Sequence, residues 1–168
     1  MSKFDLVVIG AGPSGYAAAM RALDFSKKVL LIERGKVGGA GVTNGALSSK
    51  TWWELSRESS AFRKGLKKHN IKAPGADYKE VQAETRKAVQ ERMDMLHEHM
   101  EALKHSNYAD LLEFKTGTAR LISQHEVEII SGAHKEVVQA DNVILATGSR
   151  PRLLPDLPID EKIVMTSE

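Results

Sequence analysis

Residues 4–15 read FDLVVIGAGPSG, an apolar run that ends in three glycines with the spacing Gly-x-Gly-x-x-Gly. The apolar residues 4–9 are typical of a strand buried on both faces of a parallel sheet. Pro13 stands where a helix can begin, and the alanine-rich residues 16–25 continue that helix. A second apolar run follows at residues 29–32, so the sequence predicts a strand, a helix and a parallel strand in succession.

The three glycines predict a site for the pyrophosphate of a dinucleotide. Gly10 permits the tight turn, Gly12 lets the backbone approach the phosphates, and Gly15 allows the helix to pack closely on the strand. The helix N-terminus presents unpaired N–H groups and a partial positive charge to the same phosphates. Glu33 closes the second strand, where a carboxylate accepts hydrogen bonds from ribose hydroxyls and disfavours a ribose 2′-phosphate. The turn by itself does not separate NAD from FAD.

Two helices are expected in the middle of the chain. After a glycine-rich loop at residues 35–45, Ser48 or Ser49 is expected to cap a helix that ends near residue 66. Three of its apolar residues are expected to face the core, namely Leu55, Phe62 and Leu66. Residues 78–105 then form a long helix, interpreted as an arm packed on the preceding helix. Its apolar seam consists of Val89, Met93, Leu96, Met100 and Leu103.

The last third of the chain is expected to form short strands. Four apolar segments separated by turns predict a small meander, at residues 111–114, 119–122, 127–130 and 137–138. Residues 143–146 predict a further buried strand, which ends at Thr147-Gly148. The proline-rich segment after Arg150 is expected to wrap the surface.

The composition excludes several classes of function. The chain has 168 residues, 42% of them hydrophobic and 27% charged, with a net charge of +2. So small a charge argues against nucleic acid or a membrane surface as a partner, and the Lys67-Lys68-His69 cluster is interpreted as a solvated helix end. No apolar run is long enough to span a membrane, and we expect a cytoplasmic protein.

The residue types and their spacing also argue against metal and thiol chemistry. The chain has no cysteine, so it holds no disulfide and no thiolate metal site. His97 and His99 are two residues apart on a helix and face different ways. Together with His105 they are interpreted as solvated histidines, and no metal site is expected.

Three later segments carry a resemblance to a known family. Residues 38–50 read GGAGVTNGALSSK, residues 116–120 read TGTAR and residues 146–151 read ATGSRP. In this order they resemble the redox-active segment, the adenine-contacting stretch and the later FAD-contacting strand end of the pyridine nucleotide-disulfide oxidoreductases, of the dihydrolipoamide dehydrogenase type. The resemblance runs from Lys3 to Glu168 and implies that the dinucleotide is FAD. The residues it implies at the cofactor are Gly10, Gly12, Pro13, Ser14, Gly15, Glu33, Arg34, Gly39, Ala40, Lys50, Thr118, Ala119, Ala146, Thr147 and Gly148.

The redox-active segment departs from the family at two positions. The resemblance places cysteines there, and this chain has Gly41 and Ala46 instead. Because a thiolate is the species that attacks a disulfide, neither residue can take over its chemistry. The resemblance also places Lys50 beside the flavin, where an ammonium stabilises negative charge on the reduced ring. Trp52 and Trp53 are adjacent and face different ways on a helix, so one of them is expected in the core. Either one covers the flavin or is only structural.

The sequence therefore predicts an α/β, Rossmann-like FAD-binding domain with a parallel sheet, a long helical arm and a small β-meander, incomplete relative to the family. Residues 1–150 form that domain, and residues 151–168 connect it toward an NAD(P)H-binding domain that the chain lacks. The complete protein is expected to be a homodimeric oxidoreductase passing electrons from NAD(P)H to a non-disulfide acceptor. This chain alone is expected to be inactive, with no catalytic residue of its own. The alternative is a non-catalytic FAD-binding module or a degenerate paralogue.

Overall fold

The computed structural model of the chain describes residues 2–43 and 45–166. Asn44 of the quoted segment 38–50, together with Met1, Ser167 and Glu168, lies outside the described residues. The elements are β1 (Lys3–Ile9), α1 (Pro13–Asp24), β2 (Val29–Glu33), α2 (Gly39–Val42), α3 (Ala46–Lys68), α4 (Tyr78–Lys104), β3 (Leu112–Thr116), β4 (Thr118–Ser123), β5 (Glu126–Ser131) and β6 (His134–Leu145).

One six-stranded sheet organises the fold, with the strand order β3-β2-β1-β6-β5-β4. Strands β3, β2, β1 and β6 are parallel, and β5 and β4 continue the sheet in antiparallel pairing. The predicted α/β class and the β1-α1-β2 unit are confirmed. The sheet places the carboxyl ends of its four parallel strands along one edge.

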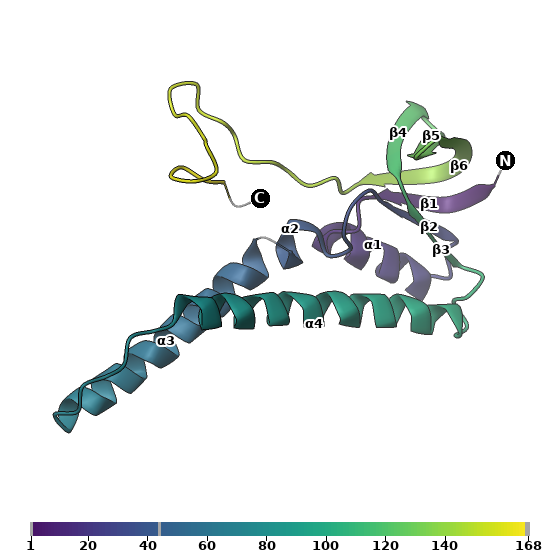
Figure 1. Ribbon diagram of the computed structural model, residues 1–168. Coiled ribbons are helices and arrows are strands. Elements are labelled where there is room, and N and C mark those ends of the chain that lie inside the picture. The colour runs from purple at the N-terminus through teal and green to yellow at the C-terminus, as the bar shows by residue number, and fades with distance from the viewer. Residues whose placement is uncertain (1, 44, 167–168) are drawn as a thin grey trace.

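Each face of the central strands has its own core. Val8 and Leu31 point to the face covered by α1 and α4, where Ala19, Leu96 and Met100 pack against them. The neighbours of these strand residues point to the opposite face, where side chains of β5 and β6 cover them. In Figure 1 the β4–β5 end of the sheet curls above the β1–β2 strands, on the side away from the helices. This explains why β1 and β2 are almost continuously apolar.

Two strand predictions were wrong in their partners. Residues 111–114 are predicted to belong to the meander, but the strand found there, β3, pairs in parallel with β2, from Val29↔Leu112 to Glu33↔Thr116. The segments 137–138 and 143–146 were predicted as two strands, but β6 is a single strand of 12 residues. Its first half pairs with β5 and its second half with β1, so one strand joins the meander to the parallel sheet.

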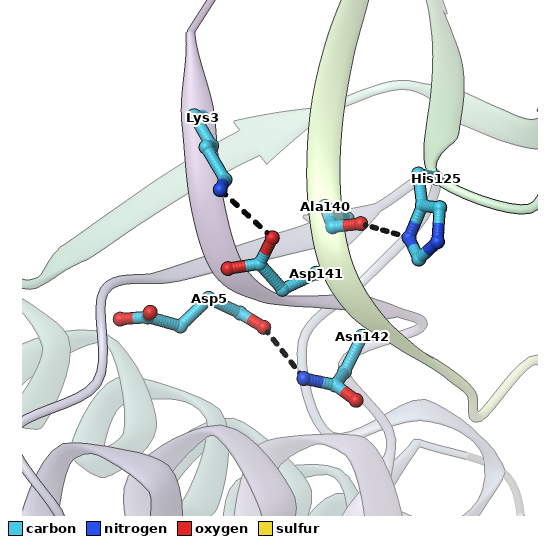
Figure 2. Close-up of polar contacts among 6 residues, drawn as sticks. All are labelled: Lys3, Asp5, His125, Ala140, Asp141 and Asn142. Atoms are coloured by element: carbon cyan, nitrogen blue, oxygen red, sulfur yellow. Dashed lines mark hydrogen bonds and ion pairs between the residues drawn. The ribbon is translucent and has the colours of Figure 1, made fainter.

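Side-chain contacts stabilise β6 at the point where its pairing changes from β5 to β1 (Figure 2). The Lys3 ammonium lies 3.0 Å from the Asp141 carboxylate, and the Asn142 side-chain amide donates to the Asp5 carbonyl oxygen at 3.2 Å. The His125 ring nitrogen Nδ1 lies 3.0 Å from the Ala140 carbonyl oxygen, which accepts its hydrogen bond. These contacts come from β1 on one side and from the β4–β5 turn on the other. They hold β6 in register where it changes partner.

The start of α3 differs from its prediction. The helix begins at Ala46 after Gly45, so Ser48 and Ser49 lie within its first turn rather than at its cap. Both hydroxyls donate to carbonyl groups three residues earlier, whereas a cap residue would accept from a backbone N–H. No described residue of α3 is fully buried, and Phe62, predicted to face the core, is 59% exposed. Leu55 and Leu66 are half-buried.

The long helix α4 was predicted correctly within a residue at its end, and it packs on α3 as expected, but its apolar seam does not face α3. Leu96 and Met100 lie against α1 and the sheet rather than against α3. The helix therefore covers the core, and only its N-terminal part meets α3 (Figure 1).

The segment after β6 has no helix or strand among residues 146–166. It was expected to wrap the surface, but it projects from the end of β6 (Figure 1), and Leu153 and Ile163 are 64% and 87% exposed. Among the described residues, no helix combines the length and the hydropathy that crossing a membrane requires.

Candidate functional site

A cleft of about 890 Å³ lies where the parallel strands end. The loops that follow β1, β2, β3 and β6 form its walls, with α2 beside them. Ligand sites in open α/β sheets occupy this position, outside the carboxyl ends of the strands. The structure brings most of the predicted site residues to this cleft: Gly10, Gly12, Pro13, Ser14, Glu33, Arg34, Gly39, Ala40, Thr118, Ala119, Ala146, Thr147 and Gly148.

The three fingerprint glycines meet three different steric demands. Gly10 has φ of +104°, and a Cβ there would collide with the Ala146 carbonyl oxygen. A Cβ on Gly15 would collide with the Gly10 carbonyl oxygen, so the close approach of α1 to the end of β1 depends on Gly15. A Cβ on Gly12 would meet nothing within 4 Å, although this residue lines the cleft. Gly12 therefore leaves room for a ligand rather than for a protein neighbour.

The N-terminus of α1 is prepared for an anion. Gly12 is the cap residue of this 12-residue helix, and no side chain caps it. Pro13 has no N–H, and the first-turn N–H groups of Ser14 and Gly15 have no acceptor among the described residues. These groups and the helix dipole favour a phosphate at the mouth of the turn.

Glu33 has a structural function that the sequence did not reveal. One carboxylate oxygen accepts from the Ala11 N–H at 2.7 Å, and the other accepts from the Gly35 N–H at 2.7 Å. The carboxylate thereby fastens the glycine turn to the loop after β2. A carboxylate has about four acceptor positions, so it can still accept from ribose hydroxyls while it holds both N–H groups.

The cleft is electropositive. Three cations line it, Arg34, Lys36 and Arg150, against the single carboxylate of Glu33. None of the three cations forms an ion pair with another described residue. Lys36 and Arg150 were not among the predicted site residues, although Arg150 follows the Thr147-Gly148 pair closely enough to be suspected. Such a charge balance suits a ligand with two phosphates.

The segment that departs from the family lies partly in the cleft. Gly41, on α2, lines it, and a Cβ on Gly41 would collide with the Pro13 ring. A larger side chain at this position would require α2 to move away from the glycine turn. Ala46 begins α3 on the surface.

The side chains that the sequence placed beside a flavin, Lys50 and one of the two tryptophans, do not line the cleft. Lys50 lies on the exposed side of α3 and does not line it, so its function stays a prediction. Trp52 packs edge-to-face on Tyr78 with ring centroids 5.5 Å apart, and Trp53 is 64% exposed. Neither tryptophan belongs to the core, contrary to the expectation for one of them.

One of the three helix histidines is not merely solvated. The Tyr16 hydroxyl lies 2.6 Å from His99 Nδ1 and joins α1 to α4. Burial raises the pKa of Tyr16, against the positive charge of Arg92, so the hydroxyl keeps its proton. Among the described residues, no group of three or more histidines and carboxylates is placed to hold a metal ion.

Comparison with known proteins gives a consistent family. The sequence profile described as pyridine nucleotide-disulphide oxidoreductase matches residues 4–167. Dihydrolipoyl dehydrogenase of Chlamydia pneumoniae is 34% identical over 98% of this chain, which covers 34% of that protein. Soluble pyridine nucleotide transhydrogenase of Mycobacterium bovis is 30% identical over 100% of this chain, which covers 36% of that protein.

Solved structures agree on the fold. The HOCl-induced flavoprotein disulfide reductase RclA from Escherichia coli, in its Cu(II) complex, has a TM-score of 0.71 and 16% identity over 92% of this chain, and 31% of that chain is covered. The present chain thus spans about a third of the length of the curated relatives it matches. The profile match over residues 4–167 includes every residue that lines the cleft.

Proposed function

The chain belongs to the pyridine nucleotide-disulphide oxidoreductase family, and from this premise we propose that its cleft holds the FAD of an oxidoreductase that passes electrons from NAD(P)H to an acceptor other than a disulfide. FAD is the cofactor of this family. The observation that carries the proposal is the convergence of free N–H groups, cations and one acceptor carboxylate on a cleft that only glycine keeps open at position 12.

Different residues of the cleft would bind different parts of FAD. The N–H groups of Ser14 and Gly15 and the cations Arg34 and Arg150 would hold the pyrophosphate, and Glu33 would accept from the ribose hydroxyls. Backbone at Thr118 would lie against the adenine. Bound FAD supplies hydride acceptance from NAD(P)H and onward electron transfer. The protein supplies position, exclusion of water and positive charge.

The acceptor is proposed from the missing thiols. The chain has no cysteine, and Gly41 and Ala46 stand where the family resemblance places the reactive pair. The collision of a Cβ on Gly41 with Pro13 supports the same conclusion, since α2 has no room for a thiol side chain. A quinone, a dye or a second pyridine nucleotide accepts electrons directly from a flavin and needs no thiol. We propose acceptors of this kind.

Further parts of the proposal concern the whole protein. Residues 1–150 would form the FAD domain, and residues 151–168 would connect it to an NAD(P)H-binding domain. The complete protein would be a cytoplasmic homodimer, and Lys50 would reach the flavin there. Cell fractionation and sedimentation of the complete protein test the location and the oligomeric state.

Two kinetic experiments test the proposed reaction. FAD-loaded chain is first mixed with NADH, and flavin bleaching is followed, with dithionite as the control that the flavin is reducible. No rapid, saturable bleaching is expected, because hydride transfer without a nicotinamide seat lacks positioning worth about 7–11 kcal/mol. Fast bleaching would show that this chain binds both cofactors.

The second experiment assays the complete protein with NAD(P)H and three classes of acceptor. Quinones or dyes are expected to turn over, whereas lipoamide and glutathione disulfide are not. Disulfide turnover would contradict the assignment, and the absence of turnover with every acceptor would favour a non-catalytic FAD-binding module.

A further inference from the structure

The short helix α2 forms part of the cleft wall and contacts the glycine turn directly (Figure 1). At its start, the Gly38 N–H donates to the Ala11 carbonyl oxygen of the turn at 2.8 Å. A Cβ on Gly39 would lie 3.1 Å from the Gly12 Cα, which is tighter than an ordinary van der Waals contact. The backbone of α2 therefore meets the backbone of the turn that is proposed to hold the pyrophosphate.

The other side of α2 is anchored in the core. Val42, the last residue of the helix, is buried in the same cluster as Leu96 of α4. A Cβ on Gly38 would lie 2.8 Å from the Val42 side chain and 3.2 Å from the Leu96 side chain, so this space is already filled. Val37, which precedes α2, is buried in that cluster as well. Because protein interiors are closely packed, α2 is held between the core and the turn with little room to move.

Gly41 allows α2 to take this position. A Cβ on Gly41 would collide with Cγ of the Pro13 ring and lie 3.2 Å from Cδ. It would lie 3.8 Å from the Pro13 Cβ, which is an ordinary van der Waals distance. The conflict is therefore with two ring carbons. Gly41 is helical and does not have a positive φ, so its backbone conformation does not require glycine. The contact with Pro13 does.

We propose that α2 positions the pyrophosphate turn, and that Gly41 is the positioning residue because it lets α2 pack against the Pro13 ring. The inference rests on the proposed FAD site, and it gives a structural function to the segment that the family resemblance makes redox-active. Pro13 opens α1, so the contact with its ring fixes the first turn of that helix. The N–H groups of Ser14 and Gly15 in this turn would hold the phosphates. A side chain at position 41 would separate α2 from the turn, and FAD would then bind more weakly because it would have to order the turn itself.

Gly41→Ala tests the proposal with the smallest added side chain. The Kd for FAD, measured by titration calorimetry, should rise by about tenfold. Pro13→Ala removes the two ring carbons in conflict and keeps the Cβ, which would lie at 3.8 Å. In the Pro13→Ala background, Gly41→Ala should therefore change the Kd by only about twofold or less. Gly75→Ala makes the same chemical change where the new Cβ meets no described atom within 4 Å, outside the cleft, and should leave the Kd unchanged.

The rescue by Pro13→Ala separates positioning from a general loss of structure, which would weaken binding equally in both backgrounds. An unchanged Kd in Gly41→Ala, or equal losses in the two backgrounds, would overturn the proposal. If Gly41→Ala does not fold, a folded double variant supports the proposal and an unfolded one contradicts it.

Urea denaturation of the same variants without FAD gives a second readout. The midpoint should fall in Gly41→Ala and recover in the double variant with Pro13→Ala, and a fall of equal size in both backgrounds would contradict the contact. A wild-type chain that does not bind FAD would refute the proposed function, whereas the urea series would still decide whether Gly41 holds α2 against the turn.

Discussion

Glu33→Ala separates the two functions that the structure assigns to one carboxylate. The substitution removes the acceptor of the Ala11 and Gly35 N–H groups, each bonded at 2.7 Å. Ala11 is fully buried, so its N–H is left without a partner, at a cost of about 1–3 kcal/mol. Gly35 is exposed, and water replaces its lost bond. The free energy of unfolding should therefore fall by about 1–3 kcal/mol, which leaves an ordinary domain folded.

The same substitution should also weaken FAD binding, because it removes the carboxylate that accepts from the ribose hydroxyl. A hydrogen bond between a ribose hydroxyl and a carboxylate contributes about 1.5–3 kcal/mol, which corresponds to a roughly ten- to hundredfold loss of affinity. Glu33→Gln retains one acceptor oxygen for Ala11 but presents its amide to another donor. It should therefore lie between the wild-type chain and Glu33→Ala in both measurements.

Urea denaturation of the free chain and titration calorimetry with FAD measure the two effects. Glu98→Ala, which removes an exposed carboxylate with no ion pair or hydrogen bond among the described residues, is the matched control and should change neither. If Glu33→Ala leaves stability unchanged, the bond to Ala11 is not stabilising. If it leaves affinity unchanged, the carboxylate does not contact the ribose, and the assignment of the cleft to FAD loses one of its supports.

Four other perturbations, one with FAD and three by substitution, have outcomes that the structure predicts. FAD at a hundred times its Kd should raise the free energy of unfolding by about 2.7 kcal/mol; equal thermal shifts with NAD would contradict the choice of cofactor. Gly12→Val should leave stability nearly unchanged but abolish FAD binding, because its Cβ meets no protein atom within 4 Å; Gly15→Ala should instead destabilise the fold by about 1–3 kcal/mol through overpacking. Burial alone would lower the pKa of Lys115, but hydrogen bonds to Glu136 and Glu113 outweigh it and raise the pKa. The stabilisation it provides is therefore complete below the unfolded-state pKa of about 10.4 and is lost as the pH rises through the higher folded-state value. The stability difference between the wild-type chain and Lys115→Met should shrink in that alkaline range, and a constant difference would refute the assignment.

Local sequence predicted the elements better than their partners. The apolar runs at β1 and β2 and the glycine turn between them identified the β-α-β unit, because each signal lies within a few residues of its effect. The pairing of β3 with β2 was missed because α3 and α4 separate the two strands in the chain. The single strand β6 was divided in two because its halves face different neighbours, which blurs the period of the apolar residues.

Helix ends show the same limit on a smaller scale. Serines at positions 48 and 49 are good cap residues by type, yet α3 begins earlier, at Ala46. There both hydroxyls bond to carbonyl groups of the preceding turn. Cap preference is a local energy of about 1 kcal/mol, and the packing of α2 and α3 on the rest of the chain is able to override it.

The sequence by itself determined the α/β class, the pyrophosphate turn and the absence of thiols, because each depends on residue type and short spacing. The tertiary structure decided what residues far apart in the chain do together. It brought Arg150 and Lys36 to the same cleft, joined Tyr16 to His99 across α1 and α4, and tied Glu33 to the Ala11 N–H. Such contacts depend on which faces pack together when the chain folds, and the pattern of neighbouring residues does not encode that choice.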